Sequence, residues 1–75
     1  MYRQITYRTN GEVSERNISE QRLNEMLVQL HFLKQSGEEI EVHTNADVSN
    51  GWSWTAITVY RHMKKGTVKT VFERI

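Results

Sequence analysis

The sequence GWSWTAITVYRHM, residues 51–63, decides the fold that we predict for this chain. It is rich in aromatic and β-branched residues, which are typical of a β-strand. Successive side chains of a strand point to opposite faces of a sheet, so Ile57 and Val59 share one face, while Trp54 and Tyr60 share the other. The predicted strand is therefore apolar on both faces, although the chain has room for only one helix, which can cover only one of them.

That helix is predicted over about residues 19–36. Asn17, with Glu20 three residues later, has the spacing of a capping box, and Ser19 is an alternative N-cap. Gly37 is typical of a left-handed C-cap. Apolar residues recur within the helix at the spacing of one helical face, which should pack on the sheet: Leu23, Met26, Leu27, Leu30 and Leu33.

A first hairpin is predicted in front of the helix. Residues 2–9 are rich in Tyr, Ile and Thr, and Asn10-Gly11 follows them as a turn signal. A three-residue loop with glycine in the left-handed region opposes Tyr7 to Val13 and keeps apolar side chains together. A two-residue turn would oppose Tyr7 to Ser14, so we favour the longer, bulged loop.

A second hairpin follows the helix. Residues 38–44 alternate strictly between polar and apolar, as a half-buried strand does, and Asn50-Gly51 is again a turn signal. A two-residue turn there opposes Val42 to Val59, provided that the strand runs regularly through residues 45–48. Those residues are polar enough to form a loop instead.

A third turn is predicted at Lys65-Gly66 and leads into the last strand. It opposes Val59 to Phe72 on one face and Tyr60 to Val71 on the other.

Together these elements predict an α+β fold: a two-layer sandwich of ββαβββ order, with one helix on one face of a mainly antiparallel sheet. Residues 1–75 form a single domain, because a chain of 75 residues is too short for two cores. Whether the first strand lies beside the fourth or the fifth is left open. We expect the helix to cover Ile5, Tyr7, Val13, Ile40, Val42, Ile57, Val59, Met63, Val68 and Phe72.

The composition narrows the function classes. The chain has no cysteine, which excludes disulfides and thiolate metal sites, and no stretch is typical of a signal peptide or a membrane span. A cytoplasmic protein is expected. The formal net charge of +1 argues against a simple polyanion binder. Residues 12–47 nevertheless carry eight acidic against three basic residues, and residues 52–75 carry five basic against one acidic.

The face opposite the helix is the candidate binding surface. An antiparallel sheet normally presents polar residues to water on its uncovered side, whereas three aromatic residues are expected here. Trp and Tyr are enriched in protein interfaces. An alternative is that residues 44–51 or the N-terminal segment fold over the two tryptophans as a satellite core. The predicted interface, with a second copy or another protein, consists of Trp52, Trp54, Tyr60, His62, Val71, His43 and Glu41.

A single-stranded nucleic acid is the alternative partner. Such proteins combine a positive groove with aromatic platforms, and basic residues lie on the same predicted hairpin as Trp54 and Tyr60. In the predicted register Arg61 points toward the helix, which weakens this hypothesis. The alternative contacts are Lys64, Lys65, Lys69 and Arg61.

No enzyme activity, metal site or cofactor is predicted. His43 and His62 could share the open face, but the sequence contains no metal-ligand spacing of histidines and no nucleophile at an informative spacing. The sequence therefore favours a small non-enzymatic protein-binding domain, of the accessory, regulator or inhibitor type.

Overall fold

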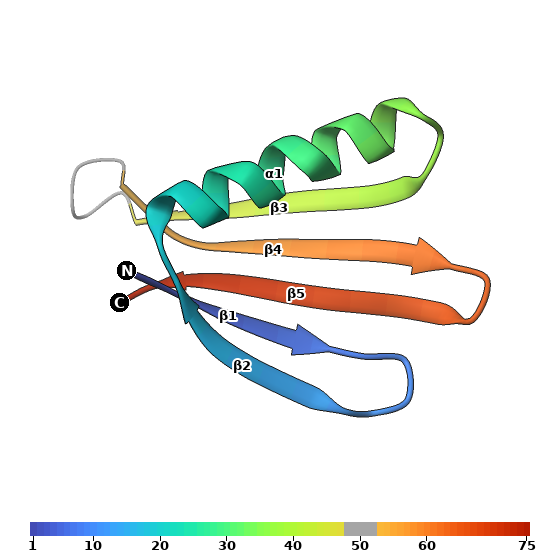
Figure 1. The fold of residues 1–75 in the computed structure, drawn as a ribbon, viewed down its shortest axis with the longest axis horizontal. Helices are drawn as coiled ribbons and strands as arrows, with labels where there is room; N and C mark the ends of the chain where they lie inside the picture. Colours follow the sequence, from blue (N-terminus) through green and yellow to red (C-terminus); the bar gives the residue numbers. More distant parts are fainter. Residues whose placement is uncertain (48–52) are drawn as a thin grey trace.

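The computed structural model describes the backbone of residues 1–47 and 53–75 and the side chains of residues 1–45 and 56–75. One helix packs against a five-stranded antiparallel sheet with the strand order β2-β1-β5-β4-β3, so the predicted α+β sandwich of ββαβββ order is confirmed. Figure 1 shows α1 lying along the β3 side of the sheet, while β1 and β2 extend beyond it. The elements are β1 (Tyr2–Tyr7), β2 (Val13–Ile18), α1 (Glu20–Gln35), β3 (Glu39–Asp47), β4 (Ser53–Met63) and β5 (Gly66–Arg74).

The ends of α1 follow from its capping residues. Ser19, the second of the two predicted N-caps, accepts a hydrogen bond from the Arg22 backbone N–H at 3.2 Å. Asn17 belongs to β2, where it pairs with Arg3. At the other end Gly37 has φ of 105°, which is the left-handed conformation predicted for the residue after the C-cap. At 16 residues, and with charged side chains along it, α1 could not span a bilayer, nor does the described chain hold a longer apolar helix.

The first hairpin has the predicted bulged loop. Tyr7 pairs with Val13, the Arg8 N–H donates to the Glu12 carbonyl at 2.8 Å, and Gly11 has φ of 87°. The positive φ explains why glycine occupies the third loop position.

The pairing of β3 with β4 is as predicted over most of its length. Val42 lies opposite Val59, and the predicted alternation continues to Asn45 opposite Ala56. The predicted turn required a regular strand through residues 45–48. The strand is not regular there, because the register shifts between residues 45 and 46 and Ala46 pairs with Trp54. The Asn50-Gly51 turn itself lies outside the described residues.

The β4–β5 turn was predicted two positions out of register. Met63 pairs with Gly66, so Lys64 and Lys65 form the turn, and Tyr60 lies opposite Lys69 instead of Val71. Gly66 has φ of 131°, and a Cβ atom there would lie 3.3 Å from the Thr9 side chain of the neighbouring hairpin. Gly66 therefore lies at the start of β5, where that strand comes close to the turn between β1 and β2. A shift of two residues leaves each side chain on its predicted face.

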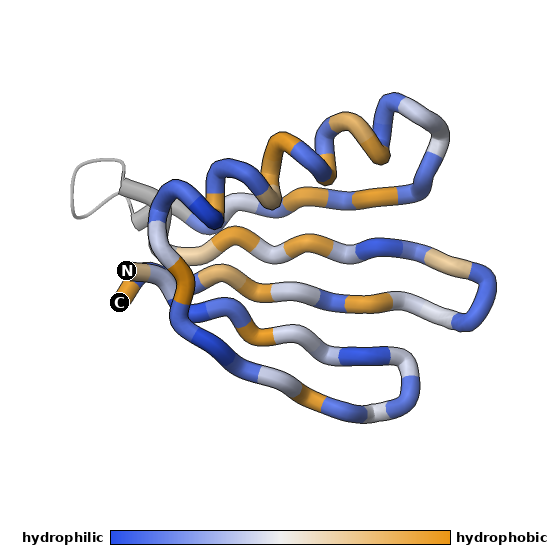
Figure 2. Tube along the Cα trace, in the orientation of Figure 1, coloured by the Kyte–Doolittle hydropathy of each residue, from blue (hydrophilic) through white to orange (hydrophobic). Residues whose placement is uncertain are grey.

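The core lies between α1 and the strands β3, β4 and β5. Figure 2 shows apolar and polar positions alternating along these strands. The partly buried Met26, Leu27, Leu30 and Leu33 of α1 pack against the buried cluster, which confirms the predicted helix stripe. The cluster consists of Tyr2, Ile18, Leu23, Ile40, Ile57, Val59 and Phe72.

The predicted facing of the first hairpin is wrong. In β1 Gln4 lies opposite Phe72, so Gln4 and Tyr2 face the helix side, whereas Ile5, Tyr7 and Val13 lie on the opposite face. The physical reason is the register of β1 against β5, which puts Tyr2 and Gln4 on the face of Phe72. The helix α1 lies along β3 (Figure 1), and only Tyr2, Gln4 and Ile18 of this hairpin are buried.

Beyond Tyr2 and Ile18, the helix side of the hairpin is polar. Arg16 Nε donates to Gln4 Oε1 at 3.1 Å, and Gln4 Nε2 donates to Thr6 Oγ1 at 3.4 Å. Ile5, Tyr7 and Val13 thus point away from the helix, whereas Tyr2 and Ile18 join the core on the helix side. Two residues predicted on the covered face, Val42 and Met63, are 46% and 44% exposed at the margins of that face.

Candidate protein interface

We call the sheet surface opposite α1 the open face. Its central row crosses four strands, from Tyr7 on β1 through Lys69 on β5 and Tyr60 on β4 to Glu41 on β3. The Lys69 ammonium lies 5.4 Å from the centroid of the Tyr7 ring and 5.9 Å from that of Tyr60. Both contacts are within the range of a cation–π interaction, so one lysine joins two aromatic rings on neighbouring strands.

Aliphatic side chains adjoin this row. Val13 lies opposite Tyr7 and is 59% exposed, and Tyr7 itself is 40% exposed. Ile5 and Val71 lie opposite each other in the neighbouring row and are half-buried. Because successive rows of one sheet face are in contact, these residues and Tyr60 form one continuous apolar surface.

A charged cluster borders this surface at one end. Arg3 on β1 places Nε 3.0 Å from Glu15 Oε1 on β2 and a terminal nitrogen 3.6 Å from Glu73 Oε2 on β5. All three side chains are about half exposed, so these ion pairs contribute little to stability. They place one positive and two negative charges at the margin of the apolar surface.

A hydrogen-bonded chain borders the other end. His62 Nε2 lies 2.8 Å from Glu41 Oε2, and His62 Nδ1 lies 3.0 Å from Thr67 Oγ1. Since a carboxylate only accepts, Nε2 donates to Glu41, and in the neutral ring Nδ1 then accepts from Thr67. The order hydroxyl, imidazole, carboxylate is used in nucleophilic catalysis. Here the three side chains lie exposed on the strand surface, and we assign Glu41 and Thr67 the role of orienting the His62 ring.

The contact with His62 changes the ionisation of Glu41. The hydrogen bond from His62 lowers the pKa of Glu41 below its ordinary value of 4.5, and positive charge on His62, His43 and Lys34 acts in the same direction, while lost hydration opposes it. Because the folded pKa is lowered, the pair stabilises the fold above pH 4.5, and this contribution is lost as the pH falls through the lowered pKa.

We therefore expect the substitution His62→Ala to raise the pKa of Glu41 toward its ordinary value. The measurement is an NMR titration of the Glu41 carboxyl carbon. His31→Ala is the control, because His31 lies exposed on α1 and is not among the groups that shift the pKa of Glu41. An unchanged midpoint in the His62 variant would show that the two side chains are not in contact in solution.

Five of the predicted interface residues come together as expected. Tyr60, His62, His43, Glu41 and Val71 share the open face, and the rings of His43 and Tyr60 meet edge to face with centroids 5.8 Å apart.

The two tryptophans are not placed by the structure. Trp52 lies outside the described residues, and Trp54 is described only by its backbone, in β4 opposite Ala46. Their assignment to the interface, and the alternative of a satellite core, both stay predictions.

Sequence reasoning missed the contribution of the first hairpin. Ile5, Tyr7 and Val13 were assigned to the helix side, although their alternation was read correctly. The alternation of β1 carried no signal for this, because both of its faces mix polar and apolar residues. The position of β1 beside β5, with Gln4 opposite Phe72, decides that Gln4 and not Ile5 turns toward the helix.

The basic residues of the alternative hypothesis do not form one patch. Arg61 lies on the helix side, as expected, and donates to Glu38 Oε1 at 2.7 Å, while Arg61 Nε and Glu38 Oε2 are buried without a hydrogen bond in the described part of the chain. Lys69 lies between two tyrosines on the open face. Lys64 and Lys65 are exposed at the β4–β5 turn.

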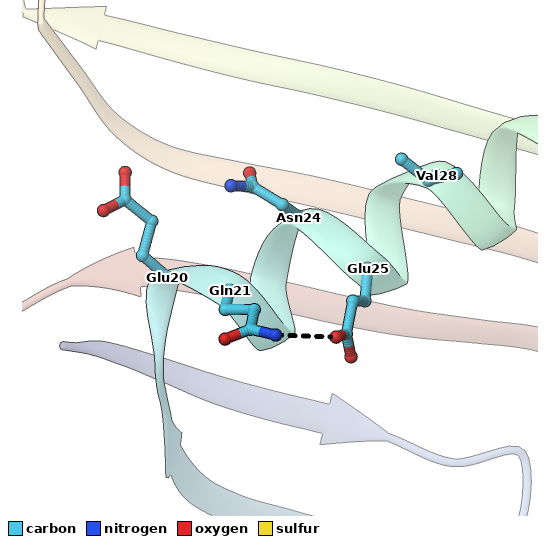
Figure 3. A pocket seen from close by; sticks show the side chains of 5 residues that line it. All are labelled: Glu20, Gln21, Asn24, Glu25 and Val28. Carbon is cyan, nitrogen blue, oxygen red and sulfur yellow. Dashed lines mark hydrogen bonds between the residues drawn. The ribbon is translucent and has the colours of Figure 1, made fainter.

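Concave surfaces lie at several places, and one of them is lined by Glu41 and His62 at the margin of the open face. A cavity of about 210 Å³ lies between α1 and the sheet, bordered by Leu30, Val59, Arg61 and Phe72. The outer face of α1 carries a shallow depression in which Gln21 donates to Glu25 at 3.4 Å (Figure 3). The described residues contain no group of three or more side chains that could hold a metal ion.

Comparison with known proteins gives no further constraint on the site. The chain matches no family model, no curated protein and no solved structure.

Proposed function

We propose that this protein is a small non-enzymatic binding domain, of the accessory, regulator or inhibitor type, that engages a protein partner through its open face. One observation carries the proposal: Ile5, Tyr7, Val13, Tyr60 and Val71 form a continuous apolar surface on a side of the sheet over which the described chain places no other element.

Folding alone gives no reason for this surface. The uncovered side of an antiparallel sheet is normally polar, whereas here Ile5, Tyr7 and Val13 lie on that side, next to the Arg3–Glu15 ion pair. An exposed apolar surface lowers solubility unless a partner buries it, so its retention on a small domain favours a binding role.

The arrangement of charge also supports a protein partner. Interfaces combine an apolar centre with a polar, solvated rim, and Tyr and Arg are enriched among the residues that dominate binding. The open face has two tyrosines at its centre, the Arg3 cluster at one end and the Glu41–His62 pair at the other. Small molecules prefer concave sites, and the cavity beside Phe72 lies on the other side of the sheet.

We expect the double substitution of Tyr7 and Tyr60 by serine to abolish partner binding. Loss of one dominant interface residue costs about 2 kcal/mol or more, which is roughly thirtyfold in affinity. The measurement is affinity capture from a lysate of the protein's own cells with quantitative mass spectrometry, and the melting temperature of each variant checks its fold.

The matched control replaces Val28 and Phe32 by serine on the outer face of α1, where they are 54% and 63% exposed. The wild type and this control should retain the same protein. The proposal is wrong if the tyrosine variant retains the partner protein as well as the control does. It is also wrong if the melting temperature of the tyrosine variant falls steeply, because the tyrosines then serve the fold.

Single-stranded nucleic acid stays the second candidate, because Lys69 between two aromatic rings also suits a stacked base with its phosphate. Binding of a short oligonucleotide at low salt, weakened steeply by added salt and by substituting Lys64 and Lys65, would favour it. An apolar protein interface should respond little to salt. The cytoplasmic location expected from the sequence stays a prediction.

A further inference from the structure

The strand β3 forms one edge of the sheet, with Val42 exposed on its helix side and Glu39, Glu41 and His43 on its open face. It has nine residues, and β4 is its only partner strand in the described chain. On its helix side Ile40 is 4% exposed, whereas Val42, two residues further along, is 46% exposed. Edge strands are templates for pairing with another chain, and proteins usually protect them with charge, shortness or a covering element.

The opposite edge shows such protection. The strand β2 has six residues, and its centre carries Glu15 and Arg16. When identical strands pair antiparallel about a two-fold axis, one residue lies opposite its own copy. Centring β2 on Glu15 or on Arg16 would set like charges against each other, so these two registers are disfavoured at this edge.

The β3 edge, by contrast, is self-complementary in one register. If the axis passes at Val42, Glu41 lies opposite His43 of the second copy, and His43 lies opposite its Glu41. Both residues are on the open face, as their pairing with Tyr60 and Thr58 shows. On the helix side Val42 then meets its own copy, and Ile40 meets Thr44.

Neighbouring registers lack this complementarity. An axis at Glu41 would set two carboxylates opposite each other, and an axis at His43 would set Glu41 opposite Asn45 and lose both pairs of acid with histidine. A carboxylate can accept a hydrogen bond from an imidazole across two strands, whereas two carboxylates repel each other, so the sequence of β3 favours the register at Val42.

A depression beside the same edge provides room for the second copy. It has a volume of about 370 Å³ and lies between α1 and β3, with Leu27 and His31 on the helix and Val42 on the strand among its lining residues. The lining is mainly apolar and continuous with the exposed side of Val42. In the register at Val42 the valine and Thr44 of the second copy come to lie at its mouth.

We propose that the β3 edge binds a second copy of this chain, antiparallel and with the two-fold axis at Val42, so that the two five-stranded sheets become one continuous sheet. Since such an axis is perpendicular to the sheet, both open faces point to the same side and stay accessible. The inference concerns an edge that adjoins the open face at Glu41 and His43, and it goes beyond the proposed function.

Cysteine trapping tests the register directly, because the chain has no cysteine of its own. In the proposed dimer the Cα atoms of position 42 in the two copies lie about 4.5–5.5 Å apart, within the range of a disulfide. We expect Val42→Cys to form a disulfide-linked dimer under mild oxidation at least roughly tenfold faster than the same thiol would on a chain that does not self-associate. The reason is that pairing raises the effective thiol concentration.

Thr44→Cys is the matched control on the same strand and the same face. Its two copies would lie about 14 Å apart along the paired strands, too far for a disulfide. Equal rates for the two variants, or faster trapping of Thr44→Cys, would overturn the register at Val42.

Substituting Val42→Lys tests the interface without crosslinking. A lysine is tolerated at an exposed edge position but sets two positive charges at the axis, so light scattering should show a monomer at concentrations where the wild type associates. The matched substitution Val13→Lys, on the open face and β2, should leave this dimer intact. Loss of self-association in Val13→Lys but not in Val42→Lys would assign self-association to the open face, and a wild type that stays monomeric would overturn the inference.

Discussion

Replacing Phe72 by alanine is expected to lower the free energy of unfolding by about 3–5 kcal/mol, which is the usual effect of truncating a buried aromatic residue. Phe72 is 1% exposed and lies in the central strand β5, opposite Gln4 on one side and Ile57 on the other. It also borders the cavity between α1 and the sheet, which the truncation would enlarge. A small domain of 75 residues has a total stability of about 4–11 kcal/mol, so a large fraction of the variant should be unfolded.

Urea denaturation followed by circular dichroism measures this change. The control is Phe32→Ala, which truncates the same residue type on the outer face of α1, where Phe32 is 63% exposed. An exposed substitution should change stability by only about 0.5 kcal/mol. Equal destabilisation by the two substitutions would contradict the assignment of the core to the helix side of β5.

The second large effect is expected for Leu23→Ala in the first half of α1. Leu23 is 2% exposed and shares the core with Tyr2 and Ile18, so its truncation should cost about 2–5 kcal/mol. Alanine favours the helix itself, and the loss therefore measures the packing of α1 on the sheet. Thermal unfolding should show a lower midpoint with the helix content of the folded state retained.

Val28→Ala is the matched control for Leu23→Ala. Val28 is 54% exposed on the same helix, and its truncation removes little buried surface. We expect its melting temperature to stay close to that of the wild type. A similar fall in both variants would mean that α1 does not dock on the sheet through its predicted stripe.

The open face and the β3 edge give the molecule two adjoining surfaces for association. The open face carries Tyr7 and Tyr60 about Lys69, and the edge carries Val42 between Glu41 and His43. Glu41 and His43 belong to both surfaces, since they lie on the last strand of the open face. A dimer through β3 would place two open faces side by side and would present a partner with a surface twice as wide.

Local patterns explain the elements that could be predicted. The cap at Ser19, the glycine at position 37 and the helical spacing of the leucines define α1 within a few residues. The bulged loop before Val13 and the pairing of Val42 with Val59 also follow from neighbouring residues. Turn chemistry was less informative at the last hairpin, where Gly66 begins β5 with a φ of 131° that other residues rarely adopt and also lies close to Thr9.

The candidate site was predictable only where the strand lies under the helix. The alternation of β4 is sufficient to put Tyr60 and His62 on the face opposite Ile57 and Val59, because the helix has only that apolar side to cover. In β1 both faces mix polar and apolar residues, so the alternation does not tell which face meets the helix.

The sequence by itself determined the α+β class, the position of the helix and the residues that share a face within each strand, because periodicity and turn conformation depend on near neighbours in the chain. Only the tertiary structure decided that β1 lies beside β5 and that Ile5, Tyr7 and Val13 turn away from the helix. Alternation along a strand tells which side chains lie together but not toward which layer they point. That direction depends on the register of β1 against β5 and on the placement of α1, which lies along β3 and meets the first hairpin only at Tyr2, Gln4 and Ile18.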